Sequence, residues 1–354
     1  MPLSEPPKTD LRPSITLRST SISHPVSVHE SALAIVVPAH RLRHFEESLL
    51  SIAEQTDRRF RVYVGDDASP EPLESTVDRF RSSLDIHYTR FPENLGGHDL
   101  VAHWRRCILL TKDERWLWLF SDDDLMAPEC VASFYRTLDE STQPNLDLYR
   151  FQLDFVDERS VQFNRPASHP SYETHNELLA AMLTDRRRAW RAQDHIFSRE
   201  VYEQTGGFVS FPSAIYSDFA TWLRFASTRG VGTISGARVS WRSHSTGISS
   251  GLRKANRAEW LAAAALYLTW LDSFARQHGR RTEEIFRRAG RAFYFRELSL
   301  FRPWLTLRER HSAVELSHRL FKSTRFSMYV HLWVALSRQA SVPVWRRIRS
   351  QLRR

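Results

Sequence analysis

Three consecutive carboxylates, Asp122, Asp123 and Asp124, are the residues of this chain best suited to chemistry. They follow an apolar run, Trp116–Phe120, which is long enough for one buried strand and too short for an independent helix. Acids gathered at the end of a buried strand repel one another and are costly to desolvate unless a cation compensates them. A hard divalent cation that holds a diphosphate would supply that compensation, and a solvated acidic turn that caps the next helix is the alternative.

The sequence before these aspartates alternates between strand-like and helix-like segments. The predicted strands cover residues 32–39, 60–64, 85–90 and 116–120, with helices predicted at 45–55, 73–80 and 98–110. This alternation predicts a doubly wound α/β sheet with mostly parallel strands, in which ligands bind beyond the carboxyl ends of the strands. Three of those ends carry unusual polar groups, which we therefore expect to form one site: Pro38–Arg41, Gly65–Ser69 and Ser121–Asp124.

Four motifs, in order along the chain, resemble those of family 2 glycosyltransferases of the GT-A fold. They are AIVVPAHR, VYVGDDASP, PENLGG and WLWLFSDDDLMAPE, and the resemblance spans about Ala32 to Ser250. It implies an α/β fold of the GT-A (Rossmann-like) type, with a mixed, mostly parallel sheet flanked by helices, and an enzyme of the bacterial surface-glycan type. The domain organisation that we expect is a flexible arm (1–30), a nucleotide-binding half (31–140), an acceptor half (141–250) and a basic helical region (251–354).

The resemblance also implies a nucleotide site at the three strand ends. Its residues are Pro38, Ala39, His40, Arg41, Asp67, Asn94, Gly96 and Asp122. The first four should line the nucleobase, Asp67 should accept a hydrogen bond from the base, and Asp122–Asp124 should bind the ribose and, through a metal, the diphosphate. From the residues alone, Asp67 could instead close an Asx turn, and the paired glycines after Asn94 could mark a simple turn.

A divalent metal, Mn²⁺ or Mg²⁺, is implied by the same resemblance. The ligands that it implies are Asp122, Asp123, Asp124 and His244. The common form of the motif begins with an acid where this chain has Ser121, which shifts metal binding to the three aspartates that follow, with Asp122 and Asp123 favoured. A lone histidine is often structural, so both roles stay open for His244.

Asp218 is the general base that the resemblance implies. The family commonly has Glu-Asp at this place, and here Ser217 replaces the Glu while Asp218 keeps the carboxylate. An Asp at the start of a helix is also a common cap. In an inverting transfer, a base takes the proton of the acceptor hydroxyl while a metal stabilises the departing diphosphate. We therefore expect a metal-assisted glycosyltransferase that moves a sugar from a nucleotide-sugar donor to a glycan or lipid-linked acceptor by single displacement.

An arginine-rich run, Arg186–Arg191, lies between the metal motif and the base. Such a run is usually a solvated face, but four arginines beside an anionic substrate could also close over the donor diphosphate. Both interpretations stay open at this stage.

Basic charge is concentrated in the last third of the chain. Residues 251–354 contain 22 Lys and Arg against 7 Asp and Glu, while residues 1–250 contain 28 against 34. The spacing of apolar residues there is helical, with breaks expected at Gly279 and Pro303. One hypothesis is attachment to an anionic membrane surface, and the alternative is a helical bundle that packs on the catalytic domain or dimerises.

The compartment follows from what the sequence lacks. There are only two cysteines, no apolar core of a signal peptide in the first thirty residues, and no apolar run of the ~20 residues that span a bilayer. The expected location is therefore cytoplasmic, peripheral on the cytoplasmic face of the inner membrane.

Other functions remain as alternatives. The net charge of +9 suggests a nucleic-acid-binding protein, but that charge lies outside the α/β half and no nucleic-acid motif is present, so we expect no nucleic-acid partner. A nucleotidyltransferase could share a nucleotide-binding α/β sheet, but the chain lacks a phosphate loop rich in Gly and Lys. Because Ser121 and Ser217 stand where the family has acids, a non-catalytic relative also stays open.

Overall fold

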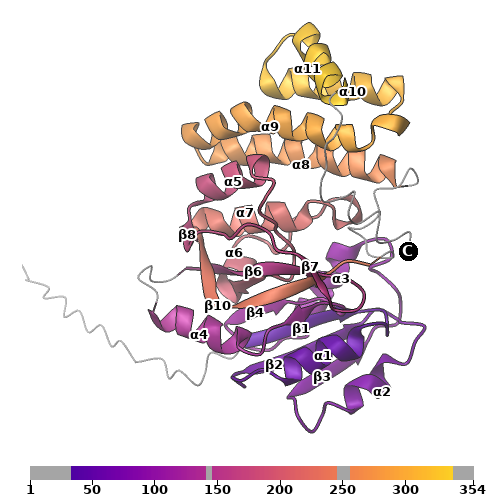
Figure 1. Cartoon of the computed structure of the whole chain (residues 1–354), viewed down its shortest axis with the longest axis vertical. Coiled ribbons are helices and arrows are strands. Elements are labelled where there is room, and N and C mark those ends of the chain that lie inside the picture. The colour runs from indigo at the N-terminus through magenta and orange to yellow at the C-terminus, as the bar shows by residue number, and fades with distance from the viewer. Residues whose placement is uncertain (1–32, 141–145, 245–255, 338–354) are drawn as a thin grey trace, which may run out of the picture.

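The computed structural model describes residues 33–140, 146–244 and 256–337 (Figure 1). The predicted N-terminal arm and the last part of the basic region lie outside these residues. The strands are β1 (Leu33–Ala39), β2 (Phe60–Asp66), β3 (Ile86–Arg90), β4 (Trp116–Leu119), β5 (Leu125–Met126), β6 (Leu148–Val156), β7 (Gln162–Asn164), β8 (Tyr172–Glu173), β9 (His195–Ser198) and β10 (Val231–Arg242). The α-helices are α1 (Phe45–Ala53), α2 (Leu73–Asp78), α3 (Leu100–Ile108), α4 (Cys130–Glu140), α5 (His175–Thr184), α6 (Arg199–Gln204), α7 (Ser217–Arg229), α8 (Arg257–Gln277), α9 (Arg280–Leu300), α10 (Leu307–Phe321) and α11 (Arg325–Ser337).

All these strands form one sheet. Its order is β3-β2-β1-β4-β9-β6-β10-β5, with β7 beside β6 and β8 beside β10. The pairs β1–β2, β2–β3, β1–β4 and β6–β10 are parallel, and β9 joins β4 to β6 with antiparallel pairing on both sides. The predicted α/β class with a mixed, mostly parallel sheet is confirmed, and the two expected halves of the catalytic domain share that one sheet.

Each face of the sheet has its own hydrophobic core. Along β1, Leu33, Ile35 and Val37 pack with α1, α2 and α4, while Ala34 and Val36 pack with α3, α5 and α7 on the other side. Successive strand residues point to opposite faces, so a strand that is apolar throughout is expected where both faces are covered. The run ALAIVVPA predicted that situation correctly.

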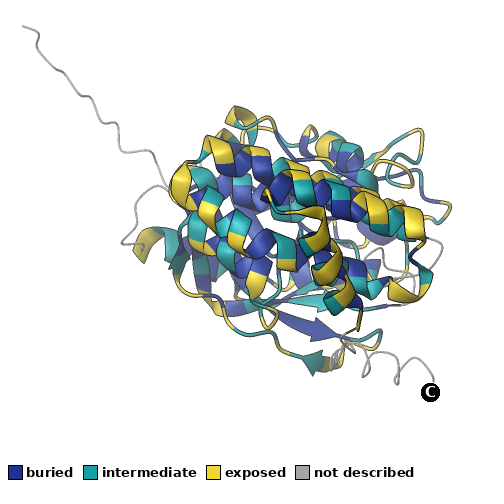
Figure 2. Ribbon diagram, turned by 90° about the horizontal axis from the view of Figure 1, so that it is seen from above, coloured by how far each residue is buried: buried dark blue, intermediate teal, exposed yellow. Residues whose placement is uncertain are grey.

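The C-terminal helices continue the second of these cores. α8 and α9 pack on α5 and α7, and α10 and α11 lie beyond them (Figure 1). Seen from above, the helices at this end of the molecule have buried, intermediate and exposed residues alternating along their length (Figure 2). The predicted breaks are confirmed, because Gly279 separates α8 from α9 with φ 93° and Pro303 lies in the 3₁₀ turn after α9. No helix in the described ranges is long and apolar enough to cross a membrane.

Leu271→Ala tests whether these helices belong to the same cooperative unit as the sheet. Leu271 of α8 is fully buried in the core that also holds α7, so its truncation should cost about 2–5 kcal/mol of unfolding free energy. We expect one thermal transition, by calorimetry, at a lower midpoint. The matched control is Leu266→Ala on the same helix, where the side chain is 48% exposed and the change should stay within about 0.5 kcal/mol. Two separate transitions in Leu271→Ala would contradict a shared core.

Candidate active site

The carboxyl ends of β1, β2 and β4 lie side by side. In the register of β1 and β2, Pro38 pairs with Gly65 and Ala39 with Asp66, and the amide of Phe120 donates to the carbonyl oxygen of Val36 at 2.8 Å. The residues that follow each strand therefore meet at one edge of the sheet, as the parallel order requires. This edge brings together the predicted nucleobase segment and the three aspartates.

Asp122 joins two of these strand ends. Its Oδ2 accepts hydrogen bonds from the backbone amides of His40 at 2.9 Å and Arg41 at 3.3 Å. Burial, together with the charge of Asp123, raises the pKa of Asp122 to about 7, although the two amides act in the opposite direction. The residue predicted to contact the ribose thus fixes the backbone of the segment predicted to line the base.

Asp123 and His244 form the part of the predicted metal site that the structure brings together. Oδ2 of Asp123 lies 2.6 Å from Nε2 of His244, and the Asp123 side chain is 26% exposed. A carboxylate oxygen and an imidazole nitrogen that converge in this way are both ligands for a divalent cation. Mg²⁺-type sites commonly use one or two carboxylates and are completed by substrate phosphates and water. The pair therefore fits a metal whose remaining ligands come from a diphosphate.

Asp124 is more deeply buried than Asp123. It is buried, and its Oδ1 accepts the backbone amide of Arg242 at 2.7 Å. Burial, followed by the charge of Asp123, raises the pKa of Asp124 well above its usual range, while a hydrogen bond from Ser121 lowers it. Within the described ranges, no three His, Cys, Asp or Glu side chains converge as a preformed metal site. Of the four predicted ligands, Asp123 and His244 are in direct contact, while one oxygen of Asp122 and one of Asp124 accept backbone amides. The binding of a metal by these four residues stays a prediction.

Arg242 is a central residue of this site that the sequence did not single out. Its guanidinium is buried, and Nε donates to the carbonyl oxygen of Asp123 at 2.7 Å. The same side chain donates to Glu47 on α1 at 2.8 Å and to the hydroxyl of Ser160 at 3.0 Å. One planar group with several donors therefore ties the aspartate loop to α1 and to the β6–β7 turn. The only signal in the sequence was its place two residues before His244.

Arg242→Met should loosen the aspartate loop. The substitution leaves the Asp123 carbonyl and Ser160 without their donor, and we expect a loss of about 2–3 kcal/mol in unfolding free energy, measured by urea denaturation. Arg136→Met is the control, since Arg136 is exposed on α4 and its loss should cost no more than about 0.5 kcal/mol. Equal stability of the two variants would show that Arg242 does not hold the loop.

Asp67 organises the loop that carries Asn94 and Gly96. Its two carboxylate oxygens accept the amides of Leu95 and Gly96, each at 2.8 Å, and Arg106 of α3 forms an ion pair with it. A Cβ at position 96 would lie 2.7 Å from Oδ2 of Asp67, so the close approach requires glycine there. A base would have to share these oxygens with donors of the protein. Asp67 is therefore a positioning residue here, and its contact with the base stays a prediction.

The ring of His40 lies within the same group. Its Nδ1 is 3.2 Å from the carbonyl oxygen of Asp67, and the amide nitrogen of Asn94 is 3.2 Å from its Nε2. Asn94 also accepts the amide of Gly97 at 2.7 Å, which closes the turn that the sequence suggested. The structure thus places His40, Asp67, Asn94 and Gly96 together, with Arg41 exposed at the rim.

Asp218 lies in the first turn of α7. Its Oδ1 accepts the amide of Phe219 at 2.9 Å, and burial raises the pKa of Asp218 to about 6. Arg191 lowers that pKa through its charge and Asp194 raises it. A carboxylate with this pKa is ionised at neutral pH and is more basic than an ordinary aspartate. Ser217, which replaces the family's acid, is buried, and its hydroxyl accepts the amide of Phe211 at 3.0 Å.

The C-terminal helices fix the start of α7. Tyr216, immediately before it, has a left-handed backbone (φ 65°), which is uncommon for a bulky residue. The Tyr216 ring stacks on Tyr267 of α8 at 5.0 Å, and its hydroxyl donates to Glu297 of α9 at 2.9 Å. Helices far along the chain therefore hold the backbone beside Asp218, which no local pattern in the sequence indicated.

The arginines of the run Arg186–Arg191 have different surroundings. Arg187 pairs with Asp185, and Arg188 pairs with Glu173 and His169. Arg191 differs, because its guanidinium lies 4.5 Å from the centre of the Trp241 ring and its charge acts on Asp218, Asp194 and Asp124. The charges of Asp124, after β4, and of Asp218, in α7, thus both act on Arg191.

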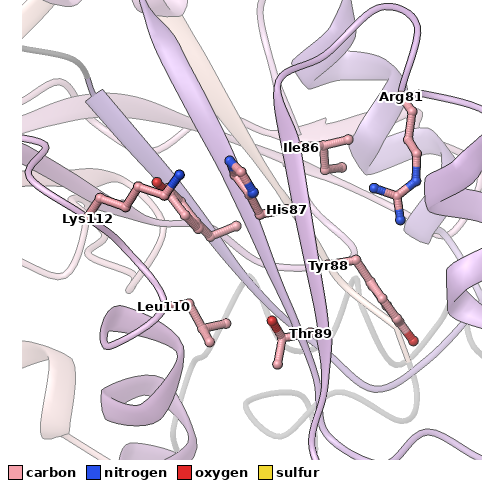
Figure 3. Close-up of a pocket in the computed structure, with 8 residues that line it drawn as sticks. Arg81, Ile86, His87, Tyr88, Thr89, Leu110 and Lys112 are labelled. Atoms are coloured by element: carbon pink, nitrogen blue, oxygen red, sulfur yellow. The ribbon is translucent and has the colours of Figure 1, made fainter.

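A separate cavity of about 300 Å³ opens beside β3, away from these groups (Figure 3). It is lined by Tyr63, Arg81, Ile86, His87, Tyr88, Thr89, Leu110 and Lys112. His87 stacks on Tyr63 at 5.1 Å, and Tyr63 donates to Glu114. None of the predicted site residues lines this cavity, so we assign no part of the reaction to it.

Comparison with known proteins finds a glycosyl transferase family 2 domain in part of this chain. Residues 34–203 match the family model for Glycosyl transferase family 2. The structure of S. aureus TarS 1–349 in complex with UDP-GlcNAc has a TM-score of 0.61 at 14% identity and covers 82% of this chain and 80% of TarS 1–349. GalNAc-T7 with UDP, GalNAc and Mn²⁺ has a TM-score of 0.52 at 11% identity and covers 84% of this chain and 56% of the other. At these identities the structural likeness establishes the GT-A fold. Comparison with curated proteins finds no match.

Proposed function

From the premise that the chain carries a glycosyl transferase family 2 domain on a GT-A fold, we propose that it is a metal-dependent, inverting glycosyltransferase. Its donor is a nucleotide-diphosphate sugar, and its acceptor is a hydroxyl of a glycan or lipid-linked glycan. The observation that carries the proposal is that Asp123 lies 2.6 Å from His244 after β4, while the buried carboxylate Asp218 has a raised pKa, and that the charges of Asp218 and Asp124 both act on Arg191.

The donor side fits a nucleotide diphosphate. The structures of TarS and GalNAc-T7 contain UDP-GlcNAc, and UDP with Mn²⁺, respectively. In this chain Asp123 and His244 would hold the cation, which when bound neutralises the diphosphate and stabilises it as a leaving group. His40, Asn94 and Asp122 are already ordered by hydrogen bonds at the edge where the nucleoside would lie. Arg191 supplies a fixed positive charge for the phosphates.

Asp218 supplies the base on the acceptor side. Its carboxylate takes the proton of the acceptor hydroxyl as that oxygen forms a bond to the anomeric carbon. The bond between the anomeric carbon and the diphosphate oxygen breaks on the opposite face, and the configuration inverts. The proposed steps need neither of the two acids that serines replace here, because Asp218 keeps the carboxylate that acts as the base. The hydroxyl of Ser121 hydrogen-bonds to Asp124, and that of Ser217 accepts the amide of Phe211.

The metal site is tested by thermal shift with UDP and GDP, with Mn²⁺ or with EDTA. A ligand at 100 times its Kd should stabilise the folded state by about 2.7 kcal/mol, and we expect the larger shift only with Mn²⁺. Asp123→Asn and His244→Ala should each abolish the metal-dependent increment. Asp113→Asn is the control, because that side chain is 88% exposed. If Mn²⁺ increases no nucleotide-dependent shift in the native protein, the proposed donor site is wrong.

Asp218→Asn should remove turnover and spare donor binding. We expect kcat to fall by about 10²–10⁴-fold, because an amide cannot accept the proton, while the nucleotide shift with Mn²⁺ stays that of the native protein. The measurement is the release of nucleoside diphosphate in the presence of acceptor. Turnover at the native rate would exclude Asp218 as the base.

In the native enzyme, the pH profile of kcat/KM should also decline on the acid side, beginning near pH 6. Above that pH the carboxylate of Asp218 is ionised and can accept the proton, and below it the protonated acid cannot, so kcat/KM should fall about tenfold per pH unit below the pKa. The residual rate of Asp218→Asn should lack this decline. A decline retained at the same pH in Asp218→Asn would assign it to another group.

A further inference from the structure

One face of α11 is apolar and exposed. Its side chains are Phe326 (79% exposed), Tyr329 (43%), Val330 (43%) and Trp333 (69%). They recur at intervals of three and four residues, which places them on one side of the helix, while Met328, Leu332 and Leu336 face the core. An exposed apolar stripe of this kind marks an interaction surface.

The stripe continues onto α10. Nδ1 of His311 on α10 lies 2.7 Å from the hydroxyl of Tyr329 on α11. Because the two helices run antiparallel as a hairpin, the first turn of α10, before His311, lies beside the part of α11 that follows Tyr329. That turn of α10 carries Leu307, which is 80% exposed. Five of the nine large apolar side chains exposed in the described residues thus belong to this hairpin, and we call these five the hairpin face. Its clustering distinguishes it from the other four, which are scattered over the domain.

The surroundings of the hairpin face are basic. Arg308, Arg319, Lys322 and Arg325 are exposed on the hairpin, and α11 contains no acidic residue. The two acids of α10 are paired, Glu309 with Arg257 and Glu315 with Arg325. In the sequence that follows, residues 338–354 contain six arginines and no acid.

We propose that the hairpin face binds the surface of an anionic lipid bilayer. Helices that lie in a membrane interface combine an apolar face with basic residues, and Trp and Tyr prefer that depth. Phe326 and Trp333 enter the headgroup region, while the arginines and Lys322 attract the anionic lipids. A second copy of the chain fits less well, because an isologous contact would bring two basic rims together. A nucleic acid also fits less well, because its phosphates require cations across the contact surface, and the centre of the hairpin face is apolar.

The placement of the hairpin agrees with this role. It lies at the end of the molecule opposite β2 and β3, with α8 and α9 between it and the sheet (Figure 1). The nucleotide edge of the sheet thus stays clear of the bilayer. This attachment does not depend on the proposed transfer reaction, since it involves none of the residues assigned to the donor or the base.

Sedimentation with sucrose-loaded vesicles tests the proposal. The full chain is mixed with vesicles of phosphatidylcholine alone or with 30–40% phosphatidylglycerol, about the range in which surface charge governs binding. We expect binding only to the anionic vesicles, with a loss of at least tenfold in the partition coefficient for Phe326→Ser combined with Trp333→Ser. Arg319→Gln combined with Lys322→Gln should weaken binding and reduce its dependence on salt. Leu109→Ser is the matched control, because that leucine is 82% exposed at the end of α3.

Each outcome decides the matter. Exposed positions should not alter folding, so the variants are required to keep the native melting midpoint and the Mn²⁺-dependent nucleotide shift. Failure of the native chain to bind anionic vesicles, or equal binding by the Phe326/Trp333 variant, overturns the proposal. A native dimer in light scattering that this variant converts to a monomer, without vesicle binding, overturns it in favour of a subunit contact. Loss of the nucleotide shift with vesicle binding intact would instead count against the proposed function.

Discussion

Desolvation of carboxylates at one edge of the sheet is the constraint on which the rest of this site depends. Asp122, Asp123 and Asp124 follow a buried strand, and like charges so close together cannot all remain ionised without compensation. The structure gives each a different partner. Asp122 accepts two backbone amides, Asp124 accepts the amide of Arg242, and Asp123 meets His244. Three adjacent acids of one type thus have three different sets of partners.

The partners of these acids come from distant parts of the chain, and this distributes the site over the whole fold. Arg242 reaches from β10 to the aspartate loop and to α1. Tyr216 connects the base segment to α8 and α9. Removal of the C-terminal helices would therefore release the backbone beside Asp218 as well as expose a core. The described helices of the basic region are thus structural on their inner side, and α10 and α11 expose apolar side chains on the side away from the sheet.

The GT-A fold explains why the ends of β1, β2 and β4 lie side by side, whereas residues particular to this chain decide which side chains stand at that edge of the sheet. Two acids common in the family are replaced by serines here, and each serine hydroxyl is used by a neighbouring protein group. Arg191 is the member of the arginine run whose charge reaches both Asp124 and Asp218. In the proposed reaction, Asp123, His244 and Asp218 therefore carry the chemistry.

Local sequence determined the elements and the order of the site. The apolar runs at β1 and β4 could be predicted because a strand buried on both faces must be apolar throughout, and the strand ends because parallel strands bring their carboxyl ends to one edge. The breaks at Gly279 and Pro303 follow from local backbone chemistry. The same pattern put Pro38–Arg41, Asp67 and Asp122 at strand ends, whereas their roles in a nucleotide site, and that of Asn94, were implied by the resemblance to family 2 glycosyltransferases.

Only the tertiary structure decided how the individual acids are used. Asp122, Asp123 and Asp124 are identical in type and adjacent in sequence, and what separates them is which distant donor each one meets. The same is true of Asp67, whose oxygens are taken by a loop and by Arg106, and of Tyr216, whose left-handed backbone is held by Tyr267 and Glu297. Hydrogen-bond donors from distant parts of the chain leave no periodic pattern in the local sequence, so they cannot be predicted from it. The sequence by itself therefore determined at which strand ends these polar residues lie, and the packing of β10, α8 and α9 determined which partners Asp124, Tyr216 and the aspartate loop meet.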